Sequence, residues 1–128
     1  MTRIDVGGEL ADVLTPAVAA EGRFLFVSGH GPLRDGGYEP DSIAAETRLT
    51  IDNLAATLAA AGCGLEQVVR CGVFLADLAD LEAVNEVYRS MFRPPRPART
   101  TVQAAALPGG IKIEIDCVAL LDAGGAPR

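Results

Sequence analysis

Arg99 begins a stretch whose residue types and spacing could bind a small acid. In "PPRPARTTVQ" (residues 94–103), Pro97 fixes its own φ and pushes the preceding residue toward extended geometry. The β-branched residues 100–102 then favour a strand, so Arg99 should lie at its first position behind a stiff lead-in. The planar fork of a guanidinium matches a carboxylate through two parallel hydrogen bonds. The stretch therefore predicts a carboxylate-binding arginine.

Strand alternation predicts further polar side chains near Arg99. Thr101 and Gln103 share its face of one predicted strand, and Glu114 and Asp116 share a face of the next. If these strands pair through the "LPGG" turn, Gln103 lies opposite Glu114 and Thr101 lies opposite Asp116. One sheet face would then carry a guanidinium, a hydroxyl and two carboxylates, with Glu114 as a general acid/base acting directly or through water. The alternative is a solvated face whose charges pair at the surface and contribute little stability.

Three other polar residues are weaker candidates. Asn85 falls within the apolar stripe of a predicted helix, where a buried amide needs partners, so a structural role competes with a ligand contact. His30 follows "VSG" at a strand end, where sites often form, although a lone histidine in a Gly- and Pro-rich loop is more often simply exposed. Ser28 lacks a G-x-S-x-G motif and an evident His-Asp relay, which argues against a nucleophilic role.

The elements that must position these residues follow from periodicity and turn signals. Apolar residues at three- and four-residue spacing predict two helices, over 41–62 and 77–92. Apolar β-rich runs predict strands over 23–29, 65–76, 99–107 and 111–121. Residues 17–22 are a candidate hairpin partner of the first of these strands. Residues 30–40 are dense in Gly and Pro and indicate a loop.

The resulting order, β-β-α-β-α-β-β, assigns five strands of what we predict to be a mixed six-stranded sheet with two helices packed on one face, which is an α+β domain. The 128 residues suit a single domain over 1–128, with a flexible tail from about residue 122. Two helices can cover only one face of such a sheet. An apolar second face would therefore need a partner subunit to cover it.

Composition narrows the possible functions. The net charge of -6 argues against a broad nucleic-acid-binding face, which needs clustered Lys and Arg. The three cysteines have no Cys-x-x-Cys spacing and the chain has one histidine, so we expect neither a zinc site nor a disulfide framework. We recognise no signal peptide and no membrane span, and we expect a cytoplasmic protein with reduced thiols.

Four segments resemble the RidA family, also called YjgF or the L-PSP endoribonuclease family. They are "FLFVSGHGPL", "TRLTIDNLAATLAAAG", "VVRCGVFLADLADLEAVNEVY" and "PARTTVQAAALPGGIKIEIDCVAL". The resemblance covers roughly residues 20–121. Its most specific part is the run from Pro97 through Leu107-Pro108 to Lys112-Ile113-Glu114-Ile115.

The resemblance implies a chorismate-mutase-like fold, assembled as a homotrimer with clefts between subunits. It implies a hydrolase that needs no metal or organic cofactor: a deaminase like 2-iminobutanoate/2-iminopropanoate deaminase, converting 2-imino or enamine acids to 2-keto acids and ammonia. Matching the family motifs residue by residue, Arg99 would hold the substrate carboxylate, Glu114 would handle water and Thr101 would lie beside the arginine. The strand-end pair of the family falls on Ser28 and Gly29, and its helix asparagine falls on Asn85.

The chain departs from the family pattern around the expected pocket. Ala17 follows the early proline where relatives usually carry an aromatic residue, and His30 and Gly31 replace Gln and a bulky apolar residue. These changes predict a more open pocket. A non-catalytic carboxylate-binding trimer, regulatory or chaperone-like, is the alternative function, and an endoribonuclease is a third that the acidic charge disfavours.

Overall fold

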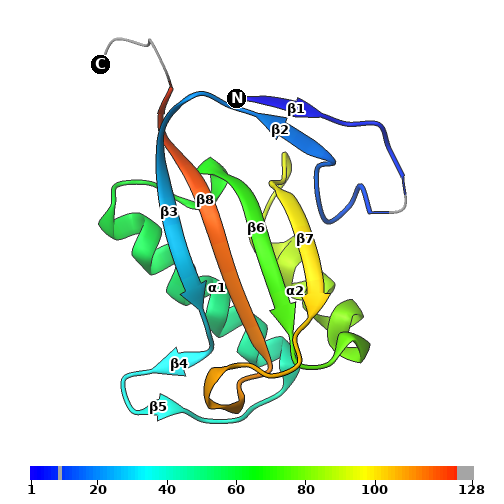
Figure 1. The fold of residues 1–128 in the computed structure, drawn as a ribbon, viewed down its shortest axis with the longest axis vertical. Coiled ribbons are helices and arrows are strands. Elements are labelled where there is room, and N and C mark those ends of the chain that lie inside the picture. Colours follow the sequence, from blue (N-terminus) through cyan, green and yellow to red (C-terminus); the bar gives the residue numbers. More distant parts are fainter. Residues whose placement is uncertain (9, 124–128) are drawn as a thin grey trace.

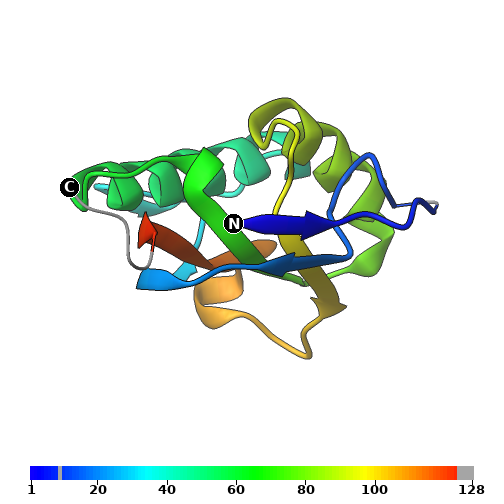
Figure 2. The same cartoon turned by 90° about the horizontal axis from the view of Figure 1, so that it is seen from above.

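A four-stranded mixed sheet carries two α-helices on one of its faces (Figures 1 and 2). The structure is a computed structural model that describes residues 1–8 and 10–123. The main elements are β3 (Gly22–His30), α1 (Ile43–Ala60), β6 (Val68–Leu75), α2 (Leu81–Met91), β7 (Ala98–Gln103) and β8 (Ile113–Ala123). Short 3-10 turns precede β6 (Leu65–Gln67), α2 (Leu78–Asp80) and β8 (Pro108–Gly110). The α+β class and both helices of the prediction are confirmed.

The strand order corrects the predicted pairing of the last two strands. The order is β3-β8-β6-β7, so β6 lies between β7 and β8 (Figure 1). β7 runs parallel to β6, whereas β8 runs antiparallel to it. Parallel neighbours need a crossover connection, which α2 provides. The segment 104–112 that contains "LPGG" is not a tight hairpin turn but passes the end of β6, so the predicted pairs Gln103–Glu114 and Thr101–Asp116 are wrong.

Smaller strands also differ from the prediction. Residues 17–19 do not pair with β3, because β2 (Ala17–Ala19) pairs antiparallel with β1 (Thr2–Ile4) instead. Within the predicted loop 30–40, β4 (Leu33–Arg34) and β5 (Gly37–Tyr38) form a short hairpin. The central sheet therefore has four strands rather than six.

The predicted flexible tail does not begin at residue 122. Asp122 belongs to β8, and its carboxylate contacts Arg23 Nε at 2.6 Å. The last five residues of the predicted tail, 124–128, lie outside the described residues.

Capping residues mark the two ends of α1, and apolar residues of both helices pack against the sheet. Ser42 caps α1 by accepting a hydrogen bond from Ala45 N at 3.1 Å. Gly62 follows the helix at φ +83°, a conformation that favours glycine. The core between helices and sheet contains Leu54 and Leu58 of α1 and Tyr88 of α2, all fully buried. Among the described residues, no helix is both long and apolar enough to cross a membrane.

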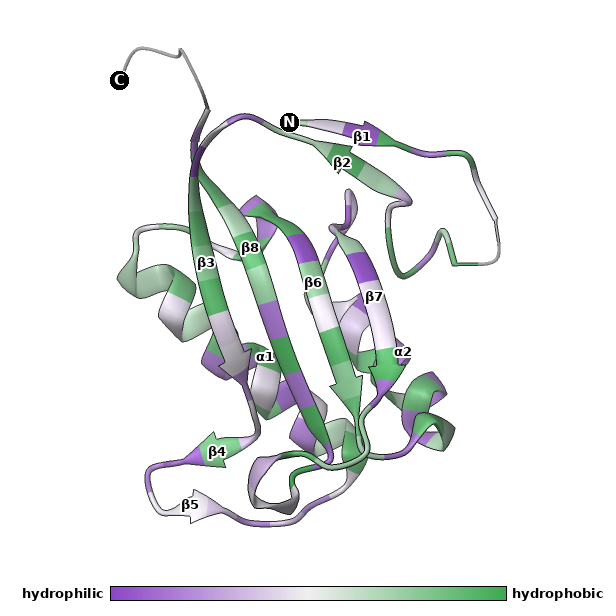
Figure 3. Cartoon of the chain, viewed as in Figure 1, coloured by the Kyte–Doolittle hydropathy of each residue, from purple (hydrophilic) through white to green (hydrophobic). Residues whose placement is uncertain are grey.

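The second face of the sheet is partly apolar and carries no helix in the described part of the chain. Phe26 on β3 is 78% exposed and Val102 on β7 is 43% exposed. Hydrophobic and hydrophilic residues alternate along β8, whose successive side chains point to opposite faces of the sheet (Figure 3). Large exposed apolar side chains gathered on one face indicate a contact surface. We call this the open face. It is made of the residues of β3, β8, β6 and β7 whose side chains point away from the two helices.

Burial of the thiols predicts which cysteines react. Cys71 and Cys117 lie opposite each other on β6 and β8, facing the helices. Burial raises the pKa of each of these two thiols to about 12 and also raises that of Cys63, so access of the reagent decides which thiol reacts. Ellman's reagent at pH 8 should therefore label only Cys63, which is partly exposed, in the native protein and all three cysteines in denaturant. Rapid native labelling of two or more thiols would contradict this.

Candidate functional site

Arg99 is held by neutral partners on two elements. Its Nε donates to Thr101 Oγ1 at 2.8 Å, and its Nη2 donates to Asn85 Oδ1 of α2 at 2.6 Å. Its Cζ lies 4.5 Å from the centroid of the Tyr88 ring, a cation–π contact. The structure thus brings together three of the predicted site residues, Arg99, Thr101 and Asn85. These contacts fix the guanidinium by one edge and one face.

Tyr88 is a site residue that sequence reasoning missed. Tyr88 is buried on α2, and its ring also supports Arg99 and stacks on Phe92 with ring centroids 4.4 Å apart. The available signal was its spacing, because Asn85 and Tyr88 are three residues apart and share one face of the helix. Both therefore reach the same guanidinium.

Hydrogen bonds to other segments fix the proline-rich backbone that leads into β7. Thr15 N donates to Pro97 O at 3.1 Å, and the Thr15 hydroxyl donates to Arg96 O. The Arg96 side chain in turn donates to carbonyls at the end of α2, from Nε to Phe92 O at 2.7 Å and from Nη2 to Arg89 O at 3.0 Å. The backbone before Arg99 is thereby tied to two other segments.

The charge of Arg99 has no counter-charge within the described part of the chain. No carboxylate among residues 1–8 and 10–123 forms an ion pair with it. Its Nη1 is buried and lacks a hydrogen-bond partner there. Burial lowers the pKa of the guanidinium, which is the signature of a desolvated charge. A desolvated cation surrounded by neutral acceptors is suited to receive an anion.

Glu114 lies on the other face of the sheet, which corrects the prediction of a shared face. Arg99 pairs with Cys71 of β6, and Cys71 faces the helices. Glu114 pairs with Phe74 of β6, three residues further on, so it belongs to the open face. The prediction failed because it assumed that β7 and β8 were neighbours. In one chain, Arg99 and Glu114 therefore do not form a common site.

Ser28 and Gly29 form a bulge that accompanies Glu114. Val27 pairs with Cys117 and His30 pairs with Ile115, so the two residues between them oppose a single residue of β8. A Cβ at Gly29 would lie 2.6 Å from Glu114 Oε2. The glycine leaves the space that the Glu114 carboxylate occupies. The open face therefore brings together a second group of predicted site residues, Ser28, Gly29 and Glu114.

His30 borders the second group, and Ala17 lies on β2. The His30 ring is 2.7 Å from Ser28 O through Nδ1 and 2.7 Å from Thr57 Oγ1 of α1 through Nε2. Because a carbonyl only accepts, Nδ1 carries the proton of the contact with Ser28 O. Ala17 is exposed on β2, and the segment before it contacts the Arg99 lead-in through Thr15.

Comparisons with known proteins agree with this fold. A sequence profile described as Endoribonuclease L-PSP matches residues 11–121. The chain is 48% identical over 101 residues to protein mmf2, mitochondrial, of Schizosaccharomyces pombe, covering 77% of this chain and 80% of that protein. It is 39% identical over 105 residues to the 2-iminobutanoate/2-iminopropanoate deaminase of Homo sapiens, covering 77% and 73%.

Solved structures extend the likeness to three dimensions. Escherichia coli TdcF, crystallised with bound serine, superposes with a TM-score of 0.75 at 31% sequence identity, covering 87% of this chain and 95% of that one. The profile spans most of the described residues, including both groups of site residues. The chain therefore belongs to the endoribonuclease L-PSP family, the RidA/YjgF family that its motifs resemble.

Proposed function

We propose that the protein hydrolyses 2-imino acids and their enamine tautomers to 2-keto acids and ammonia. The observation that carries this proposal is the half-buried Arg99 guanidinium, which has neutral partners and no carboxylate within the described chain. A substrate carboxylate would supply the missing negative charge. The deaminase names of family relatives and the serine bound to TdcF support a small, carboxylate-bearing ligand.

The opposite placement of Arg99 and Glu114 favours a site built from two copies of the chain. One copy would supply Arg99, Thr101 and Asn85, and the next would supply Ser28, Gly29 and Glu114. The open face carries exposed apolar side chains that such an assembly would bury. Repeating this contact around a three-fold axis closes the ring, so we propose a homotrimer with three sites.

The proposed reaction needs only a bound carboxylate and a positioned water. Arg99 holds the substrate carboxylate, which places the C=N carbon near the water and makes the attack effectively local. The Glu114 carboxylate takes a proton as the water oxygen bonds to that carbon of the protonated imine, and the C=N π electrons move to nitrogen to give a neutral carbinolamine. Glu114 then returns its proton to the nitrogen. The C–N bond breaks as the hydroxyl proton passes to the Glu114 carboxylate and on to solvent, and ammonia and the 2-keto acid result.

A non-catalytic carboxylate-binding trimer is the second candidate function. One observation favours it: the Arg99 cluster is complete within a single chain, whereas Glu114 is not adjacent to it. Ala17, in place of an aromatic residue, leaves less apolar contact for a substrate. Release of ammonia from imines generated in situ discriminates between the two functions, because the binding trimer would release none above the uncatalysed rate. Ribonuclease activity is disfavoured by the net charge of -6.

Replacing Arg99 should abolish turnover without unfolding the assembly. A bidentate, charge-assisted contact contributes about 2–4 kcal/mol, which corresponds to a loss of about 30- to 1000-fold in kcat/KM for Arg99→Ala. Arg99→Lys should not restore activity, because an ammonium lacks the planar fork. Ammonia release and light scattering together measure this, and wild-type-like turnover by the alanine variant would refute the assignment.

Mixed assemblies test whether two copies share a site. Arg99→Ala and Glu114→Gln chains are each expected to retain little activity alone. When they are co-expressed and assort randomly, about three quarters of the trimers contain both chains, and each of these has one intact site in three. The mixture should therefore recover about a quarter of wild-type activity. Activity no greater than the average of the two pure variants would show that both residues act within one chain.

Gly29→Ala should displace the proposed base at little cost in stability. The added Cβ meets the end of the flexible Glu114 side chain, which can move aside. A misplacement of about 1 Å can cost about 100-fold in rate, so we expect kcat to fall by about 10- to 100-fold. Gly36→Ala is the control, because its Cβ meets nothing within 4 Å. Equal kcat values for the two variants would contradict the role of Glu114.

A further inference from the structure

We propose that Glu46, a buried carboxylate on α1, is a positioning residue that sets the place of the Glu114 carboxylate. The inference rests on the proposed deaminase function, because it assigns the effect of Glu46 to the chemical step. Glu46 is outside both groups of site residues, and its side chain is 1% exposed. A carboxylate so deeply buried requires several partners to offset its lost hydration.

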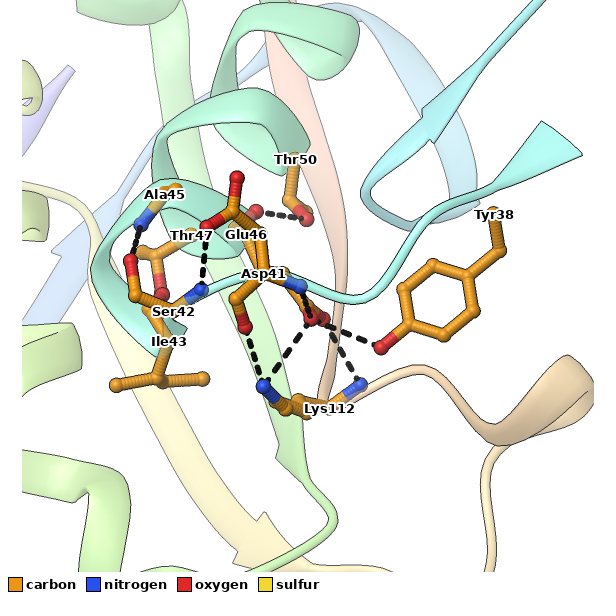
Figure 4. Close-up of polar contacts among 9 residues, drawn as sticks. All are labelled: Tyr38, Asp41, Ser42, Ile43, Ala45, Glu46, Thr47, Thr50 and Lys112. Atoms are coloured by element: carbon orange, nitrogen blue, oxygen red, sulfur yellow. Dashed lines mark hydrogen bonds and ion pairs between the residues drawn. The ribbon is translucent and has the colours of Figure 1, made fainter. Parts of the chain in front are cut away.

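The Glu46 carboxylate joins three segments of the chain (Figure 4). Oε2 accepts hydrogen bonds from the Tyr38 hydroxyl at 2.8 Å and from Asp41 N at 3.0 Å. Oε1 accepts from Lys112 N at 3.2 Å, and Lys112 Nζ lies 3.4 Å from Oε2. Lys112 Nζ also donates to Asp41 O. The β4–β5 hairpin, the start of α1 and the start of β8 therefore meet at one side chain.

The Tyr38 hydroxyl remains protonated, and so a donor, under ordinary conditions. Burial, and then the hydrogen bond to Glu46 and its charge, raise the pKa of the Tyr38 phenol to about 12. Buried ion pairs are weak contributors to net stability, since their desolvation offsets the attraction. A carboxylate that holds backbone N–H groups of two segments is instead suited to fix where those segments lie.

The hydrogen bond between Glu46 and Lys112 fixes the start of the strand that carries Glu114. Lys112 immediately precedes Ile113, the first residue of β8, and Glu114 follows two positions after it. Its N donates to Glu46, while its carbonyl accepts from Ala76 N at 3.0 Å, so both sides of this residue are held. The starting point of β8 determines where along the open face the Glu114 side chain lies.

The face of α1 that carries Glu46 also contacts the segment that follows Gly29, the glycine next to the Glu114 carboxylate. Glu46, Thr50, Asn53 and Thr57 are spaced by four, three and four residues and so share one helix face. Asn53 Nδ2 donates to Gly31 O and to Leu33 O, each at 2.9 Å. Thr57 contacts His30, immediately after the bulge at Ser28 and Gly29. One polar stripe therefore supports both the strand that carries Glu114 and the bulge whose glycine makes room for it.

Kinetics of Glu46→Ala test the positioning role. We expect kcat for imine hydrolysis to fall by at least tenfold with KM changed less than twofold, because Arg99 and its substrate contact belong to the other face. Thr50→Ala is the matched control: Thr50 is fully buried one turn away, and its hydroxyl donates only to the carbonyl of Glu46 within the helix. A wild-type kcat for folded Glu46→Ala, or an equal loss in Thr50→Ala, would overturn the proposal.

A double-mutant cycle separates positioning from general structural support. If Glu46 acts through Glu114, adding Glu46→Ala to a Glu114→Gln background should lower the residual rate less than twofold. Full additivity of the two losses would overturn the proposal. Glu46→Gln keeps the shape and one oxygen acceptor, and it carries the same cycle if the alanine variant does not fold.

A spectroscopic readout is independent of deaminase activity. The side-chain carboxyl ¹³C shift of Glu114, assigned by its loss in Glu114→Gln, should change in Glu46→Gln and remain unchanged in Thr50→Ala. If the wild-type protein releases no ammonia, the proposed function fails, but this measurement still shows whether Glu46 sets the environment of Glu114. An unchanged shift in Glu46→Gln would overturn the positioning role even in an active enzyme.

Discussion

The desolvated charge of Arg99 is the interaction on which the proposed site depends. A guanidinium taken out of water without a counter-ion is costly, and here the cost is reduced by two neutral acceptors and the face of an aromatic ring. These partners orient the group but leave its charge uncompensated within the described chain. The α2 helix supplies both Asn85 and Tyr88, so its docking against β7 decides the geometry. The same docking is reinforced by Arg96, which caps the carbonyls at the end of α2.

The position of β6 between β7 and β8 has the widest consequences for function. It places Arg99 toward the helices and Glu114 toward the open face. A chain that needs both groups at one substrate must then bring them together through assembly. The exposed apolar residues of the open face provide a physical reason for such assembly. Catalysis and oligomerisation would thus depend on the same sheet surface.

The α1 helix carries two stripes with different tasks. Its apolar stripe, which includes Ile51, Leu54 and Leu58, packs into the core and stabilises the fold. Its polar stripe binds backbone groups of β8 and of the segments around β4 and β5. Hydrogen bonds to backbone atoms act on where a segment lies, since they have defined directions, whereas apolar packing tolerates small shifts. The polar stripe is therefore the part of the helix best able to hold a catalytic group in place.

Much of the protein was predictable from local sequence. Both helices, the β-rich character of the four main strands, and the stiff lead-in to Arg99 follow from periodicity and from proline and β-branched residues, which act on the backbone of their own neighbours. The motifs also sufficed to identify the family. Asn85 and Thr101 could be named as candidates because their spacing places each one on a predictable side of its own element.

The order of strands and the facing of the site were decided only by the tertiary structure. Alternation determines which residues of one strand share a face, but it contains no information on which strands are neighbours, and the segment 104–112 is compatible with both a hairpin and a passage beside β6. The bulge at Ser28 and Gly29, the space left for Glu114 and the role of Glu46 all depend on contacts between residues far apart in the chain. Such contacts form only when the helices and strands pack, which is why the sequence determined the chemical groups and the fold determined which of them can act together.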